Sequence, residues 1–100
     1  MALTEEQLAA FQGEHGEIVA EQVTGIVCRR PRWAELDAFI TKADKGKLGA
    51  MRDLVITTAV HPSLEEVKQR IQERPGVVVG LANALTGVAG FDLSAEVRKN

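Results

Sequence analysis

Residues 17–43 decide the fold, and they read EIVAEQVTGIVCRRPRWAELDAFITKA. Before Pro31 the stretch is rich in β-branched side chains, which favour extended structure. It predicts two short strands, at about 17–21 and 24–29, that can form a hairpin. After Pro31, apolar residues recur at spacings of three and four, as on one face of a helix, and proline suits the first turn because it has no N–H group to leave unpaired. A helix is therefore predicted over residues 33–43, with an apolar face made by Trp33, Leu36, Phe39, Ile40 and Ala43.

A short amphipathic helix is predicted before the strands. Thr4 and Gln7 have the spacing of a capping box, in which a hydroxyl and an amide three residues later satisfy backbone groups at a helix start. We expect Gly13 and Gly16 to terminate this helix, because glycine is common at helix C-termini.

Two helices are predicted in the middle of the chain. The first carries apolar residues from Leu48 to Ala59 and stops before Pro62, because the residue that precedes a proline avoids the α region. The second begins at Ser63, where a capping box repeats, and its apolar face includes Val67 and Ile71.

The last predicted helix is the most apolar one. It comes after the break at Pro75-Gly76 and covers residues 77–89, and a final turn capped by Ser94 is expected within 92–100. The predicted fold class is therefore α+β, mainly α, with an N-terminal helix, a short β-strand pair and then about four helices. We expect one domain, 1–100.

The composition excludes several classes of protein. With 100 residues, 45% apolar and 26% charged, and a net charge of −2, the chain is an ordinary globular domain and too short for separate cofactor and substrate domains. The start lacks the basic and apolar pattern of a secretory signal, and no uncharged run reaches the roughly 20 residues of a spanning helix. We therefore expect a cytoplasmic protein without a membrane segment.

No arrangement of reactive side chains predicts catalysis. Cys28 is the only cysteine, so no disulfide can form within the chain, and in a predicted strand it is expected to be a small buried group. His15 at a helix end and His61 before a proline have structural explanations, and the three residues lack the paired spacing of a zinc site. We expect no catalytic, cofactor-binding or metal-binding residues, and no enzyme.

Charge is segregated along the chain. Residues 1–22 hold five acidic and no basic side chains, residues 23–52 hold seven basic and three acidic ones, and residues 53–100 hold five basic and six acidic ones. The net contributions are thus −5, +4 and −1. This pattern favours electrostatic contact, within the fold or with a partner.

Four short motifs occur along the chain in a characteristic order. The short acidic helix ends in Glu14-His15-Gly16, and the strands end in Arg29-Arg30-Pro31, with Glu35 and Phe39 on the helix that follows. A middle helix ends in Val60-His61-Pro62-Ser63. The last apolar helix comes directly after Glu73-Arg74-Pro75-Gly76.

With these motifs the chain resembles, over about residues 4–90, the tail assembly chaperones of long-tailed bacteriophages and related prophages. It departs from the family pattern at Arg32, where the family commonly has a threonine that caps the next helix together with Glu35. A lost cap hydroxyl costs about 1 kcal/mol in a typical helix.

The resemblance implies a non-enzymatic protein of the host cytoplasm. Such chaperones bind the tape measure protein, keep it soluble, help to recruit tail tube subunits, and are absent from the mature virion. Many phages also make a longer form by ribosomal frameshifting, and a chain that ends at Asn100 resembles the short form.

Seven residues are candidates for contact with a partner. We expect the apolar faces of helices 33–43 and 77–89 to pack the core, while basic residues lie at a rim and small residues on the last helix let a partner helix approach closely. The candidates are Arg29, Arg30, Arg32, Lys45, Gly80, Ala84 and Gly87.

Other interpretations remain open at this point. The arginines can instead pair with Glu35, Asp37 or the N-terminal acids, and exposed pairs of that kind contribute only about 0–1 kcal/mol. The alternative function is a small helical DNA-binding regulator that uses the basic segment 29–52. The pI of about 5.7 argues against a dedicated nucleic-acid binder, and helix 33–43 lacks the Arg, Asn and Gln residues of a recognition helix. Self-association is also open.

Overall fold

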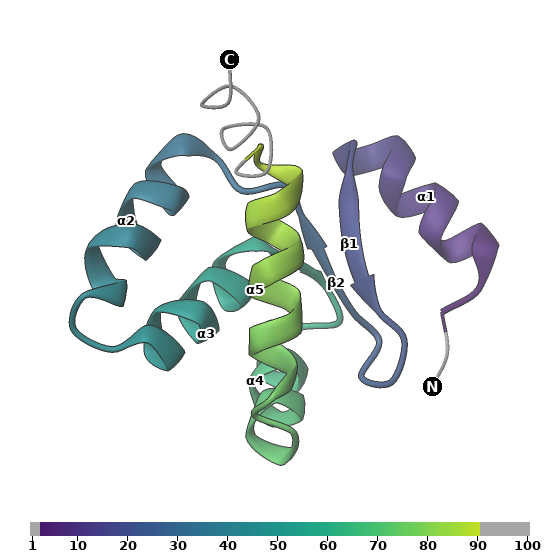
Figure 1. The fold of residues 1–100 in the computed structure, drawn as a ribbon. Helices are drawn as coiled ribbons and strands as arrows, with labels where there is room; N and C mark the ends of the chain where they lie inside the picture. Colours follow the sequence, from purple (N-terminus) through teal and green to yellow (C-terminus); the bar gives the residue numbers. More distant parts are fainter. Residues whose placement is uncertain (1–2, 91–100) are drawn as a thin grey trace.

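The computed structural model describes residues 3–90, which form five helices and one small sheet (Figure 1). The elements in chain order are α1 (Glu5–His15), β1 (Ile18–Glu21), β2 (Ile26–Arg29), α2 (Trp33–Ala43), α3 (Lys47–Thr58), β3 (Ala59–His61), α4 (Leu64–Glu73) and α5 (Val77–Val88). The predicted class, α+β and mainly α, is confirmed. The turn predicted within 92–100 lies outside the described residues.

The predicted hairpin is present. Strands β1 and β2 pair antiparallel, with Ile18 opposite Arg29 and Glu21 opposite Ile26. The Glu21 carboxylate closes the turn between them by accepting hydrogen bonds from the backbone N–H of Val23 and from the backbone and hydroxyl of Thr24. Burial alone would raise the pKa of Glu21, but these hydrogen bonds outweigh it and lower the pKa. The carboxylate is therefore the form that the turn selects.

A third strand was not predicted. Residue 59 was expected at the end of a helix, but Ala59–His61 forms β3, which pairs antiparallel with β2 and gives the sheet order β1-β2-β3. The helix α3 ends one residue earlier, at Thr58. The strand β3 depends on β2, a partner about thirty residues away in the sequence, so no local pattern indicated it.

The N-terminal helix α1 begins directly after Thr4, as the capping box predicts. Thr4 accepts a hydrogen bond from the backbone N–H of Gln7, whose side chain accepts one from Thr4 in return, so the capping box is confirmed. Gly13 lies inside α1 and does not end it, contrary to expectation. The helix ends at His15 and is capped by Gly16, whose φ of +80° suits a residue without a Cβ atom.

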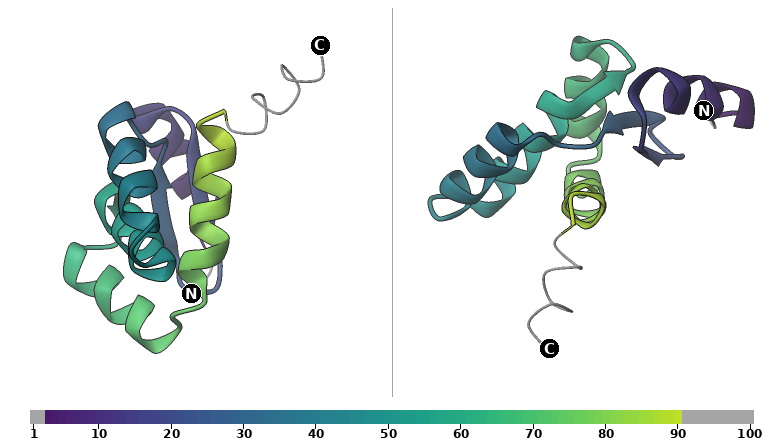
Figure 2. Two further views of the ribbon diagram at one scale, coloured as in Figure 1. Left: turned by 60° about the vertical axis from the view of Figure 1, so that its left-hand side comes forward. Right: turned by 90° about the horizontal axis from the view of Figure 1, so that it is seen from above.

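The core lies where α3 and α5 meet the sheet. In Figure 1, α5 passes in front of α3 and the sheet. The helix α1 lies to the right of α5, and the α2–α3 pair lies to its left. The view from above in Figure 2 has α5 end-on, against one side of the layer that the other elements form. The largest side chains that are less than 2% exposed in this core are those of Ile26, Val27, Val55, Val67, Val78 and Leu85.

The expectation that the apolar face of α2 packs the core holds only in part, since Leu36, Phe39 and Ala43 are half-buried. No residue of α2 is buried, and Trp33 and Ile40 expose 87% and 53% of their surface. Phe39 alone of the large apolar residues of α2 packs against the core, and it is only partly buried. The corresponding expectation for the last helix is confirmed, because Val78, Leu81, Ala82 and Leu85 of α5 are buried.

Candidate partner-binding surface

A nearly buried ion pair fixes the start of α2 relative to β2. The Arg29 guanidinium donates two hydrogen bonds to the Glu35 carboxylate, at 2.9 and 2.6 Å, and the two side chains are 17% and 15% exposed. Arg29 also donates to the carbonyl oxygen of Thr57 on α3, at 3.5 Å. Glu35 in turn accepts the backbone N–H of Arg32 at 2.8 Å. The pair therefore ties the sheet, α2 and α3 together.

This pairing gives Arg29 a structural role. The hydrogen bonds from Arg29 hold the pKa of Glu35 below its ordinary value of 4.5, against the opposing effect of burial. The same bonds raise the pKa of Arg29. Of the alternatives that the sequence left open, pairing with Glu35 is the one found, so Arg29 is not available at a partner-binding rim.

The outer face of α2 presents apolar side chains to solvent. Trp33 and Ile40 are exposed, and the half-buried Leu36 lies between them on the same face because it is three residues from one and four from the other. We call these three residues the α2 stripe. Exposed large apolar residues gathered on one helix face are typical of interaction surfaces.

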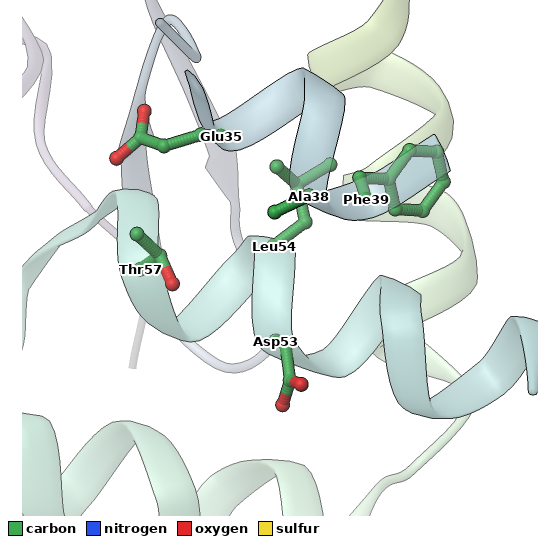
Figure 3. Close-up of a pocket in the computed structure, with 6 residues that line it drawn as sticks. All are labelled: Glu35, Ala38, Phe39, Asp53, Leu54 and Thr57. Carbon is green, nitrogen blue, oxygen red and sulfur yellow. The ribbon is translucent and has the colours of Figure 1, made fainter. Parts of the chain in front are cut away.

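The opposite side of α2 faces α3. A cavity of about 110 Å³ separates the two helices there, and Figure 3 shows Ala38 and Leu54 approaching each other across it with Phe39 alongside. The exposed ion pair between Lys42 and Asp53 bridges the same two helices. The contacts of α2 are thus made mainly by this side, and the described residues leave Trp33 and Ile40 of the α2 stripe exposed.

Cations lie near both ends of the α2 stripe. Arg30 has 62% of its side chain exposed and its nearest carboxylate, Glu17, is 3.7 Å away. Arg32 at the N-cap and Lys45 in the turn after α2 are exposed and form no ion pair with any other residue of 3–90. Since α2 is about 16 Å long, these charges bracket the stripe.

The predicted small residues of α5 also lie at the surface. Gly80 and Ala84 are exposed, and Gly87 is half-buried. A Cβ atom added at Gly80 would meet nothing within 4 Å. Packing among residues 3–90 therefore does not require glycine there, and Val79 beside it is 39% exposed.

The Cys28 thiol and the His61 ring are both packed within the fold. Cys28 is buried, its thiol lies 3.8 Å from the carbonyl oxygen of Val55, and burial raises its pKa to about 11. The ring of His61 packs against Phe11 with centroids 5.1 Å apart. Among residues 3–90, no three His, Cys, Asp or Glu side chains gather as a metal site would need, and each helix falls short of the length and hydrophobicity required to cross a bilayer.

The N-cap of α2 is occupied by Arg32, where the family that the chain resembles commonly has a threonine, and the effect of this difference can be tested. Arg32 has the extended backbone of an N-cap residue, and Glu35 supplies the reciprocal half of the box, but a guanidinium cannot accept a hydrogen bond from the helix. Arg32→Thr restores the acceptor, so we expect the free energy of unfolding to rise by about 1 kcal/mol in urea denaturation. Arg32→Ala, which restores none, is the control and is expected to give no gain.

The chain was also compared with known proteins. The family described as "Domain of unknown function (DUF6848)" matches residues 18–98, which include β1 and all elements after it. No curated protein and no solved structure matches the chain.

Proposed function

Given that the chain belongs to the DUF6848 family, whose description assigns no activity, we propose that it is a tail assembly chaperone that binds the tape measure protein of a long-tailed phage. The observation that carries the proposal is the α2 stripe, in which Trp33 and Ile40 are 87% and 53% exposed. A protein that keeps a long helical partner soluble needs such an apolar face and needs no catalytic group. The proposed site of action is the host cytoplasm, and the protein would leave before the virion matures.

The surroundings of the stripe support a protein partner. Trp and Arg are enriched among the residues that dominate binding energy at interfaces, and here Trp33 comes directly after Arg32, with Arg30 nearby. The exposed side of α5, with Gly80 and Ala84, offers a second place where a helix can approach closely. Recruitment of the tail tube protein is part of the same proposal and is assigned no surface.

The DNA-binding alternative has less support. A recognition helix presents polar side chains to base edges, whereas the outward residues of α2 are mainly apolar. Within segment 29–52, moreover, Arg29 and Lys42 are already paired with Glu35 and Asp53.

The proposal is tested by co-expression with the tape measure protein encoded in the same gene cluster. We expect the tape measure protein to become soluble and to co-purify with the chain. Trp33→Ser/Ile40→Ser should reduce the co-purified amount at least tenfold, while the melting temperature stays within about 2 °C because neither side chain is buried.

A matched control is Val23→Ser, which removes a side chain that is 61% exposed on the β1–β2 turn. It should leave co-purification unchanged. If the tape measure protein stays insoluble beside the unaltered chain, or if the double variant recovers as much of it, the proposal fails. Tight and salt-sensitive binding of the chain to duplex DNA would favour the regulator instead.

A further inference from the structure

A groove runs between α3 and α4 and reaches the start of α5. It has two lobes, of about 470 and 220 Å³, that share Arg52, Ile71 and Pro75. The larger lobe is completed by Lys68 and Gln72 of α4, and the smaller by residues of α3 and α5. We call it the α3–α4 groove. No residue of α2 lines it, so a ligand of this groove is independent of the proposed function.

The floor and ends of the groove are apolar. Ile71 and Val78 form the inner surface at 5% and 1% exposure, and Leu48, at one end, is 56% exposed. Leu48 thus carries the apolar floor outward to the surface at the α3 end of the groove.

The charge of the groove is entirely positive. Arg52 and Lys68 line it, both are exposed, and neither makes an ion pair or a side-chain hydrogen bond with another residue of 3–90. No carboxylate among the described residues lines either lobe. Asp53, the next residue after Arg52 in the sequence, is already paired with Lys42. Two cations without a carboxylate partner in 3–90 therefore border an apolar channel.

We propose that the α3–α4 groove binds an amphipathic helix whose charged residues are acidic. Such a helix places apolar side chains at spacings of three and four along the floor, and its carboxylates reach Arg52 and Lys68 on either wall. Charge complementarity selects it over a basic or neutral helix, because the cations would repel the first and remain uncompensated beside the second.

The acidic helix of the same molecule is not the occupant. The acids of α1 are exposed, but α1 packs on β1, on the side of the sheet away from α3 and α4 (Figure 1). Its two largest apolar side chains, Leu8 and Phe11, are half-buried in the fold and so are not free to enter a groove. The helix α1 of the same molecule therefore does not fill the groove, and we assign the acidic helix to a partner protein.

The test uses a fluorescein-labelled synthetic helix of about 18 residues, or five turns, with leucine on one face and glutamate on the others. Fluorescence anisotropy with the full chain should give saturable binding that weakens as salt is added. The same peptide with lysine in place of glutamate should bind at least tenfold more weakly. Amide chemical shifts of Leu48, Gly49 and Gln72 should change on titration.

Two variants separate charge from shape. Arg52→Glu/Lys68→Glu should weaken binding at least tenfold, and Gly49→Leu should do so by filling the groove, since a Cβ atom at Gly49 meets nothing within 4 Å in the free protein. Arg30→Glu/Lys45→Glu makes the same change of net charge beside the α2 stripe and should leave the affinity unchanged. Both charge variants alter exposed residues, so their melting temperatures should match that of the unaltered chain.

Three results would overturn the inference. The first is equal affinity for the glutamate and lysine peptides, and the second is equal affinity of the Arg52→Glu/Lys68→Glu variant and the unaltered chain. The third is a concentration-dependent dimer, seen by light scattering, that the same variant abolishes, because the groove would then be an interface between two copies. None of these results bears on whether the α2 stripe holds a tape measure protein.

Discussion

Glu35→Ala is expected to lower the free energy of unfolding by about 2–3 kcal/mol. The change leaves the guanidinium of Arg29, 17% exposed, without its carboxylate, and removes the acceptor of the Arg32 N–H group. Loss of one partner of a fully buried pair costs about 3–5 kcal/mol, and the partial exposure of this pair places it below that range. For a domain of this size the melting temperature should fall by roughly 10–20 °C.

The second ion pair of α2 provides the matched control. Lys42 and Asp53 also join α2 to α3, but their side chains are 58% and 42% exposed, so Asp53→Ala should cost no more than about 1 kcal/mol. Arg29→Met/Glu35→Leu should recover part of the loss, because it leaves no uncompensated charge at the junction. Equal losses for Glu35→Ala and Asp53→Ala in urea denaturation would contradict the structural role of Arg29.

The same pair should appear in the pH dependence of stability. The folded-state pKa of Glu35 is below its ordinary value of 4.5, so its contribution is fully present above that value and is lost as the pH falls through the folded-state pKa. Glu35→Gln should therefore lose less stability than the unaltered chain over the acidic range below about pH 4.5. Glu21, whose pKa is also lowered, supplies a remaining acid dependence in that variant.

Local signals in the sequence were sufficient for most elements. The predicted helix 33–43 has the bounds of α2, and β1 and β2 lie within the predicted strands, because β-branched residues, Pro31 and the caps act over a few residues. The strand β3 was missed because its extended backbone depends on pairing with β2 rather than on its own residues.

The orientation of α2 could not be predicted in the same way. A spacing of three and four tells which residues share a face, but it does not tell whether another element covers that face. The structure turns the side with Glu35 and Phe39 toward α3 and leaves Trp33 and Ile40 exposed. A tryptophan directly after three arginines and a proline was the available signal, since such a residue is seldom the centre of a core.

The predicted partner-binding residues likewise fall into two groups, because tertiary contacts decide which of them are exposed. Arg30, Arg32, Lys45, Gly80 and Ala84 are exposed as expected, whereas Arg29 is held by Glu35, six residues away across a turn that the sequence did not specify. Arg52 and Lys68 were not predicted to act together because they come from different helices. Only the tertiary arrangement of α3 and α4 brings them to one groove.

Leu85→Ala and Ile40→Ala test where the core lies. Leu85 is fully buried in the core where α5 packs on α3 and β1, so its truncation leaves a cavity and should lower the free energy of unfolding by about 3 kcal/mol. Ile40 is 53% exposed, so the corresponding change should cost less than about 0.5 kcal/mol. Urea denaturation of the two variants measures both losses.

The difference between these two losses separates two arrangements of the same helices. If the apolar face of α2 were packed in the core, as its periodicity alone suggests, Ile40→Ala would cost about 2 kcal/mol or more and would approach Leu85→Ala. That result would also remove the α2 stripe as a surface for a partner. A small loss at Ile40 beside a large one at Leu85 means that the apolar residues on the outer face of α2 contribute little to the stability of the free chain, which leaves them available to the partner proposed for the α2 stripe.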